Sequence, residues 1–207
     1  KAAARLSDQF RRVSGGPEKI YLAVVSGRVT PSSGCLRDQV IKDEAAHRMR
    51  VVQRGATGRG AAMGHSDSTR ADSGAEAILD YRVLRQSEAD AGRGRNRSPY
   101  SLTAVRLRTG RKHQIRVQFA DRGHVVWGDS KYGDREKRLA GRDAVGIALH
   151  AASLTIAHPV GGRTLEFRCQ PPPSWGNFRP TQQEWDAALA PWNEILETPA
   201  PGPGPVS

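Results

Sequence analysis

The chain has 207 residues, of which 37% are hydrophobic and 26% are charged, and its formal net charge is +11. This length fits one domain of ordinary size with appendages. No apolar run is long enough to cross a bilayer and no stretch resembles a secretory signal, so we expect a cytoplasmic protein without a membrane partner. The positive charge favours a polyanion as partner, with nucleic acid first and an acidic membrane surface second.

The first half of the chain alternates between periodic segments and polar loops. Apolar side chains recur at helical spacing over residues 1–13, and the Ser-Gly-Gly-Pro run that follows ends this helix. β-branched and aromatic side chains then predict a strand over residues 19–29. Further along, the composition predicts strands near 49–53 and over 75–86 and 100–110, with surface loops at 54–74 and 87–99.

Residues 108–133 combine crowded basic side chains with glycine-flanked turns, and their periodicity is ambiguous. Alternation of apolar and polar residues from Ile115 to Phe119 is typical of a strand. Thr109-Gly110 before this run and Gly123 after it are typical of a helix start and a helix stop, and we favour a short helix. Beyond it, residues 164–175 predict a last strand pair and residues 182–196 a helical patch. The Pro- and Gly-rich end, 197–207, is disordered by composition.

Common catalytic signatures are absent from the sequence. It contains no phosphate-binding G-x-x-x-x-G-K-[ST] loop and no G-x-S-x-G elbow. Its histidines are not spaced as metal ligands, so we expect no metal site. Cys35 and Cys169 are far apart and lack a CxxC companion, which indicates reduced thiols.

Several motifs in order resemble the RluA-like RNA pseudouridine synthases. The run Thr-Gly-Arg-Lys-His-Gln-Ile-Arg at 109–116 and the run Gly-Asp-Ser-Lys-Tyr-Gly at 128–133 carry the family signature. The strand Lys-Ile-Tyr-Leu-Ala-Val-Val-Ser-Gly, the segment Leu-His-Ala-Ala-Ser-Leu-Thr-Ile-Ala-His-Pro and the closing Pro-Pro-Pro-Ser-Trp match further family motifs. The resemblance covers residues 1–175, which we expect to be the catalytic domain, with 176–207 as a carboxy-terminal extension. It implies an α+β fold, a mixed and largely antiparallel sheet with flanking helices.

The resemblance also implies a reaction and a site. Such enzymes isomerise uridine to pseudouridine in ribosomal or transfer RNA, without cofactor or metal, by means of an aspartate, and no obligatory protein partner is evident. Arg116 matches the arginine that pairs with this aspartate, and Tyr21 the pocket tyrosine. We expect RNA contacts from Arg108, Arg111, Lys112, His113, Gln114 and Lys131, and a pocket-shaping turn from Gly128, Asp129 and Tyr132.

The aspartate motif of the family, His-Arg-Leu-Asp followed by Thr-Ser-Gly, does not occur in this sequence. Asp8 lies on the first helix, and Asp38, Asp43, Asp80 and Asp129 lack the motif's context. We therefore expect Arg116 to lack its partner and the chain by itself to be inactive, as a piece of a synthase. The alternative is a non-catalytic RNA-binding protein that keeps the family cleft.

Overall fold

The structure is a computed structural model that describes residues 1–12, 15–52, 74–87, 98–133 and 146–192. Seven strands form one sheet in the order β3-β2-β4-β5-β1-β6-β7, and every neighbouring pair is antiparallel. The strands are β1 (Glu18–Ser26), β2 (Ser33–Asp43), β3 (Arg48–Val52), β4 (Ala75–Ser87), β5 (Tyr100–Leu107), β6 (Leu149–Ala157) and β7 (Thr164–Arg168). Together with the helices, this sheet confirms the predicted α+β class.

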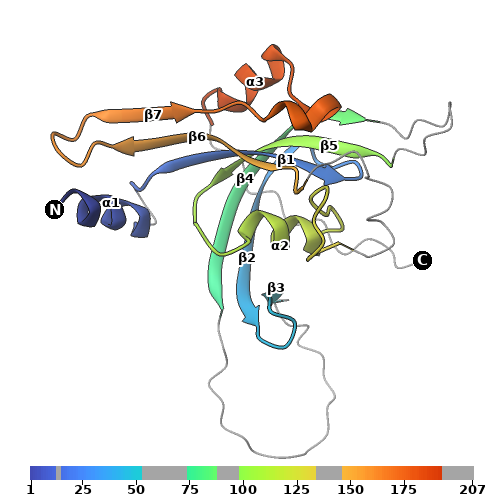
Figure 1. Cartoon of the computed structure of the whole chain (residues 1–207). Helices are drawn as coiled ribbons and strands as arrows, with labels where there is room; N and C mark the ends of the chain where they lie inside the picture. Colours follow the sequence, from blue (N-terminus) through green and yellow to red (C-terminus); the bar gives the residue numbers. More distant parts are fainter. Residues whose placement is uncertain (13–14, 53–73, 88–97, 134–145, 193–207) are drawn as a thin grey trace, which may run out of the picture.

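Helices cover the two faces of the sheet unequally (Figure 1). One face carries α2 (Gln114–Asp121), whose Ile115 and Phe119 are buried against side chains of the central strands. The opposite face carries the 3-10 helix η2 (Pro173–Phe178) and α3 (Gln182–Leu189), whose Trp185 is buried against Leu22 of β1. Because successive side chains of a strand point to opposite faces, β1 contributes to both cores.

The first helix, α1 (Ala2–Arg11), lies at one end of the sheet, beside the β6–β7 hairpin (Figure 1). It buries no residue, so polar contacts hold it in place. The Gln9 side chain pairs with Ala157 of β6, Nε2 donating to the carbonyl at 2.8 Å and Oε1 accepting from the N–H at 3.0 Å. Arg5 adds a hydrogen bond to the carbonyl of Pro159 at 2.8 Å.

Most of the predicted elements agree with these bounds. The sequence did not predict the strand β6, and three further differences occur. Residues 164–175 hold one strand, β7, rather than a pair, because its partner β6 precedes them and the prolines after it lack the N–H groups that a ladder needs. The hairpin partner of β3, the long strand β2, was not located by the sequence. The short helix begins at Gln114 rather than at Thr109-Gly110.

Several predictions fall on residues outside the described ranges. These include most of both polar loops and the segment after Trp192. The boundary predicted at residue 175 stays a prediction, although α3 beyond it packs on the same sheet. Among the helices of the described ranges, none has the length and apolar composition needed to cross a bilayer.

Candidate active site

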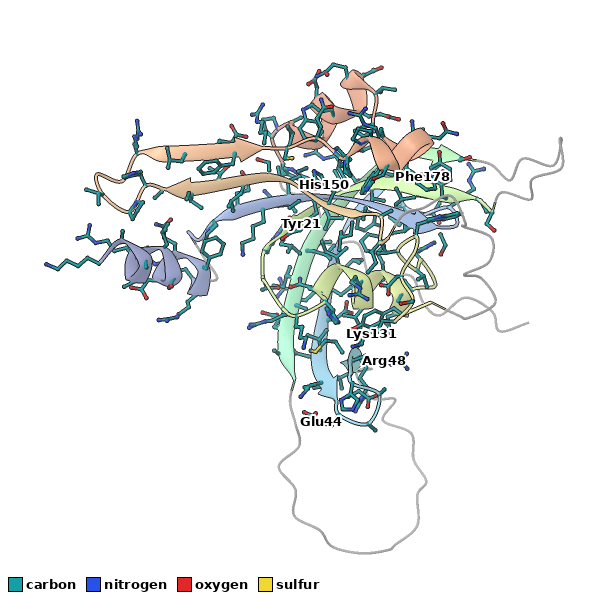
Figure 2. The ribbon with its side chains drawn as sticks, viewed as in Figure 1. Tyr21, Glu44, Arg48, Lys131, His150 and Phe178 are labelled. Carbon is teal, nitrogen blue, oxygen red and sulfur yellow. The ribbon has the colours of Figure 1, made fainter. Side chains whose placement is uncertain are left out.

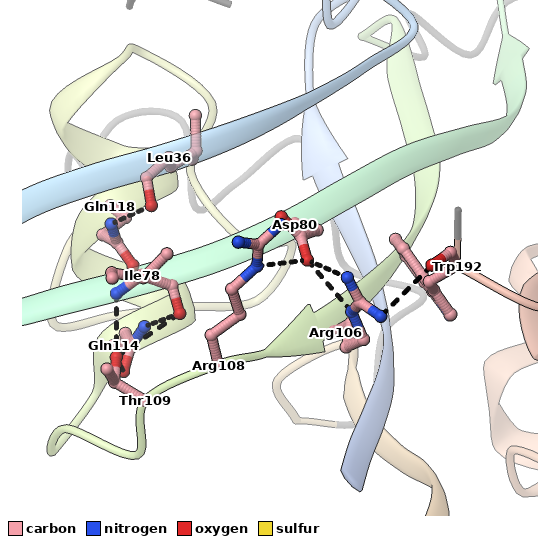
Figure 3. Close-up of polar contacts among 9 residues, drawn as sticks. All are labelled: Leu36, Ile78, Asp80, Arg106, Arg108, Thr109, Gln114, Gln118 and Trp192. Carbon is pink, nitrogen blue, oxygen red and sulfur yellow. Dashed lines mark hydrogen bonds and ion pairs between the residues drawn. The ribbon is translucent and has the colours of Figure 1, made fainter. Parts of the chain in front are cut away.

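The loop that leads from β5 into α2 is fixed from inside by Gln114. The Gln114 side chain is 2% exposed. Its Oε1 accepts from the Thr109 hydroxyl and the Arg111 N–H, both at 2.9 Å, and its Nε2 donates to the Ile78 carbonyl at 3.0 Å. The residue expected to contact RNA therefore holds the loop against β4 (Figure 3), while Lys112 lies exposed on it.

His113 occupies the left-handed position just before α2, with φ 55. Its Nδ1 lies 3.0 Å from the hydroxyl oxygen of Tyr132, and that oxygen accepts the Met49 N–H at 3.0 Å. The Tyr132 hydroxyl is therefore hydrogen-bonded both to the His113 ring and to the backbone of β3. Partial burial and the neighbouring cations, Arg116 first, lower the pKa of His113. His113 is thus a neutral imidazole at pH 7.

Arg116, in the first turn of α2, makes a two-point ion pair with Asp129. Nε meets Oδ2 at 2.7 Å and Nη2 meets Oδ1 at 2.7 Å. The Asp129 side chain is fully buried and that of Arg116 is 14% exposed. Arg116 therefore has a carboxylate partner other than the aspartate of the missing motif, and a parallel pair of charge-assisted hydrogen bonds fixes the plane of its guanidinium.

Neighbouring charge and burial shift the pKa of Asp129 in opposite directions. Burial by itself raises the pKa of this carboxyl, but hydrogen bonds from Arg116 and from the backbone of Lys131 and Tyr132 bring the pKa below its usual value. The same hydrogen bond to Asp129 raises the pKa of Arg116. The Arg116 guanidinium also lies 5.1 Å from the centre of the Tyr132 ring. Both members of the pair are therefore charged at neutral pH.

Asp129 reaches Arg116 because the turn before it is unusually tight. Gly128 has φ 77, and a Cβ atom built there would lie 2.1 Å from the carbonyl oxygen of Gly146. Upstream, Trp127 donates its N–H to Val24 of β1 at 2.8 Å. Downstream, Asp129 Oδ1 accepts the N–H groups of Lys131 and Tyr132. These contacts tie the 128–133 turn to the sheet and aim the carboxylate at α2.

Tyr21 lies in β1, on the face of the sheet that carries α2. It pairs with Val105 of β5 and Ala151 of β6, and its half-buried ring packs against the core cluster that contains Ile115. Figure 2 shows Tyr21 on the sheet between α1 and α2. Burial raises the pKa of its phenol, so the hydroxyl keeps its proton at neutral pH.

The sequence of the first 121 residues matches the family model described as RNA pseudouridylate synthase. The chain belongs to this family. The resemblance to RluA-like synthases drawn from the motifs is thereby confirmed.

Curated relatives and solved structures agree with this membership. The chain is 33% identical over 126 residues to the tRNA pseudouridine synthase C of Yersinia pestis, covering 59% of this chain and 48% of that protein. It is 34% identical over 103 residues to the ribosomal large subunit pseudouridine synthase D of Haemophilus influenzae, covering 45% and 29%. The human RNA pseudouridylate synthase domain containing 1 shares the fold, with a TM-score of 0.62 at 23% identity, covering 92% of this chain and 70% of that one. The chain spans about half the length of the curated relatives it matches, or less.

One residue of this pseudouridylate synthase domain whose structural role the sequence did not predict is Asp80 of β4. Its carboxylate is fully buried, and Oδ2 accepts from Arg106 at 2.6 and 3.0 Å and from Arg108 Nε at 2.8 Å (Figure 3). The signal was present, because a lone acidic residue stands inside the apolar run Ala-Ile-Leu-Asp-Tyr. A buried carboxylate needs a cationic partner, and the flanking strand is rich in arginine.

Among the described residues, no three His, Cys, Asp or Glu side chains are arranged to hold a metal ion. The structure brings His113, Arg116, Asp129 and Tyr132 together in one hydrogen-bonded group. Arg108 and Arg111 contact other groups: Arg108 donates to Asp80 at 2.8 Å and Arg111 donates to the Glu76 carbonyl at 2.9 Å. Exposed Lys131 lies in the turn after Asp129.

Proposed function

We propose that this chain carries the arginine, the tyrosine and the RNA-contacting loop of an enzyme that isomerises uridine to pseudouridine in ribosomal or transfer RNA. The observation that supports it most is the Arg116–Asp129 pair, on the sheet face that also carries Tyr21. Names of relatives that act on transfer and ribosomal RNA support both substrate classes.

The reaction exchanges one glycosidic bond for another. The bond between N1 of uracil and C1′ of ribose breaks, the base turns, and C5 joins C1′; C5 then loses its proton while N1 gains one. A uridine stacked in a helix is out of reach, so the nucleotide must be flipped into a pocket. Tyr21 provides an apolar ring face for the flipped base and a protonated hydroxyl at its edge. Cationic Arg111, Lys112 and Lys131 are placed to hold the flanking phosphates.

Arg116 can serve two carboxylates because it uses only part of its guanidinium for Asp129. Within the described part of the chain, its hydrogen bonds run through Nε and Nη2. Nη1 is thus the edge at which the aspartate of a His-Arg-Leu-Asp motif would be held and kept ionised. In this arrangement Asp129 orients the arginine, and the arginine orients the reacting aspartate.

The deciding experiment compares this chain with the same chain preceded by a His-Arg-Leu-Asp…Thr-Ser-Gly segment from a full-length relative. Release of tritium from C5-labelled uridine in ribosomal and transfer RNA measures the reaction. We expect no release from the chain by itself and turnover from the completed protein. RNA binding without turnover in the completed protein would favour the alternative, a non-catalytic RNA-binding protein.

Replacing Tyr21 with phenylalanine tests the role of its hydroxyl. In the completed enzyme we expect kcat to fall by about a hundredfold, the usual effect of a proton-transfer group. The free energy of unfolding should change by less than about 1 kcal/mol, because the ring remains packed. Steady-state kinetics measures the change in kcat, and urea unfolding measures the change in the free energy of unfolding. A large loss of stability with intact turnover would make Tyr21 a core residue only.

A further inference from the structure

A second basic surface lies beside the site, in a groove of about 580 Å³ between α1 and the β5–α2 loop. One wall is formed by residues 10–12 at the end of α1 and by residues 15–19. The other wall is the end of β5 and the loop as far as Arg111. Its lining includes six cationic side chains and one carboxylate, Glu18; the cations are Arg11, Arg12, Lys19, Arg106, Arg108 and Arg111.

The buried carboxylate of Asp80 organises part of this charge. Arg106 and Arg108 both lie against its Oδ2, so two cations that would repel one another are kept side by side at the groove wall (Figure 3). The Arg108 side chain is 35% exposed while held in this way. Holding arginines in a fixed orientation at a surface lowers the entropy cost of binding an anion there.

The groove also contains an aromatic side chain that the fold does not bury. Phe10, near the end of α1, is 48% exposed. The ammonium group of Lys19 lies 5.3 Å from the centre of its ring. An exposed aromatic ring among cations is the composition of sites that bind single-stranded nucleic acid, where bases stack on rings and cations follow the phosphates.

Gly16 lies close to the end of α1 in this wall of the groove. A Cβ atom at Gly16 would lie 2.7 Å from the carbonyl oxygen of Arg12, which is closer than a residue with a side chain could approach without a shift. Phe10 and Arg12 line the groove at the end of the helix that the Gln9–Ala157 pair attaches to β6.

We propose that this groove binds a single-stranded segment of RNA next to the substrate uridine. A base stacks on Phe10, and phosphates lie on Arg12, Lys19 and the arginines held by Asp80. The inference rests on the proposed function for the identity of the nucleic acid. The β5–α2 loop is shared by the groove and the α2 site, so one strand can contact both. Asp80 acts here as a positioning residue.

The test measures binding of the whole chain to a single-stranded oligoribonucleotide of about 12 nucleotides, a length within the range of known single-strand sites. Phe10→Leu keeps an apolar side chain but removes the stacking face. Its matched control is Phe167→Leu, at an aromatic residue 55% exposed on β7. Arg12→Gln with Lys19→Gln removes two groove cations, and Arg163→Gln removes an exposed one on the β6–β7 turn.

We expect Phe10→Leu to weaken the Kd about tenfold, as loss of one stacked base does, and Phe167→Leu to leave it unchanged. The Arg12/Lys19 double variant should reduce the slope of log Kd against log salt by about 1.4, or 0.7 for each single-strand phosphate. A 2-aminopurine base in the oligonucleotide should be quenched by the chain and not by Phe10→Leu. Circular dichroism checks that each variant is folded.

Wild-type affinity and an unchanged salt slope in the groove variants would overturn the proposal that the groove binds RNA, while leaving the proposed function in place. An equal loss of RNA affinity in the two control variants would also overturn this proposal, since any exposed aromatic or cationic side chain would then have the same effect. If the chain binds no RNA, both proposals fail together.

Discussion

Replacement of Arg116 with glutamine is expected to lower the kcat of the completed synthase by two to three orders of magnitude, on the order of the loss when one charged group aimed at a reacting centre is removed. RNA affinity should stay within about threefold, because the groove and loop cations that we propose to contact phosphate are untouched. Kinetics on ribosomal or transfer RNA, with binding measured in parallel, give both values.

The variant needs a control, because it leaves the fully buried Asp129 without its partner. An unpaired buried charge costs about 3–5 kcal/mol, which would by itself reduce activity. The double variant Arg116→Gln with Asp129→Asn removes both charges and should recover most of the free energy of unfolding. If activity recovers along with stability, Arg116 is a structural residue; if only stability recovers, its role is in the reaction.

Substituting alanine for Gly128 is expected to lower the free energy of unfolding by about 3 kcal/mol or more, through steric overlap added to backbone strain. The added Cβ would lie 2.1 Å from a backbone oxygen of Gly146, and φ 77 is strained for any L side chain. To make room for the added carbon, the backbone must move either at residue 128 or at Gly146. We expect this movement to displace Asp129 from Arg116. Urea unfolding should show the loss, and turnover in the completed enzyme should fall with it.

Gly123 provides the matched control for this substitution. Its φ of 80 is nearly the same, but a Cβ atom there meets nothing within 4 Å. Gly123→Ala should therefore show only the cost of the left-handed conformation, about 1 kcal/mol. Equal losses in the two variants would mean that the contact with Gly146 is unimportant and that backbone conformation alone requires glycine at 128.

The sequence predicted the strands and helices whose periodicity is strong, among them β1, β4, β5 and α1, together with the family. It did not predict contacts that depend on chain segments meeting in space. Gln114 looks like any polar residue at a helix start, and its burial follows from the approach of Thr109 and Ile78. Similarly, Asp129 is 13 residues from Arg116, and only the Gly128 turn brings them together.

Asp80 illustrates the opposite case, in which the information was available locally. A carboxylate on the buried side of an apolar strand must be paired, and the antiparallel register places Arg106 directly opposite it. Register depends on which strands are neighbours, which no single strand reveals. The helix start at Gln114 was misplaced for a related reason: His113, in a left-handed conformation, delays the first helical turn.

The Gln9–Ala157 pair gives α1 an unusual kind of attachment. The Gln9 side-chain amide bonds to the N–H and the carbonyl of Ala157, which are the groups that a residue of a neighbouring strand would bond to. Gln9 therefore takes the place of one strand residue beside β6. Two such bonds contribute about 1 kcal/mol each, and α1 adds no buried side chain to them. These hydrogen bonds fix the orientation of α1 but contribute little to the free energy that keeps it attached to the sheet. Its amides should exchange with solvent far sooner than those of β1, and a strand of RNA lying against Phe10 would slow them.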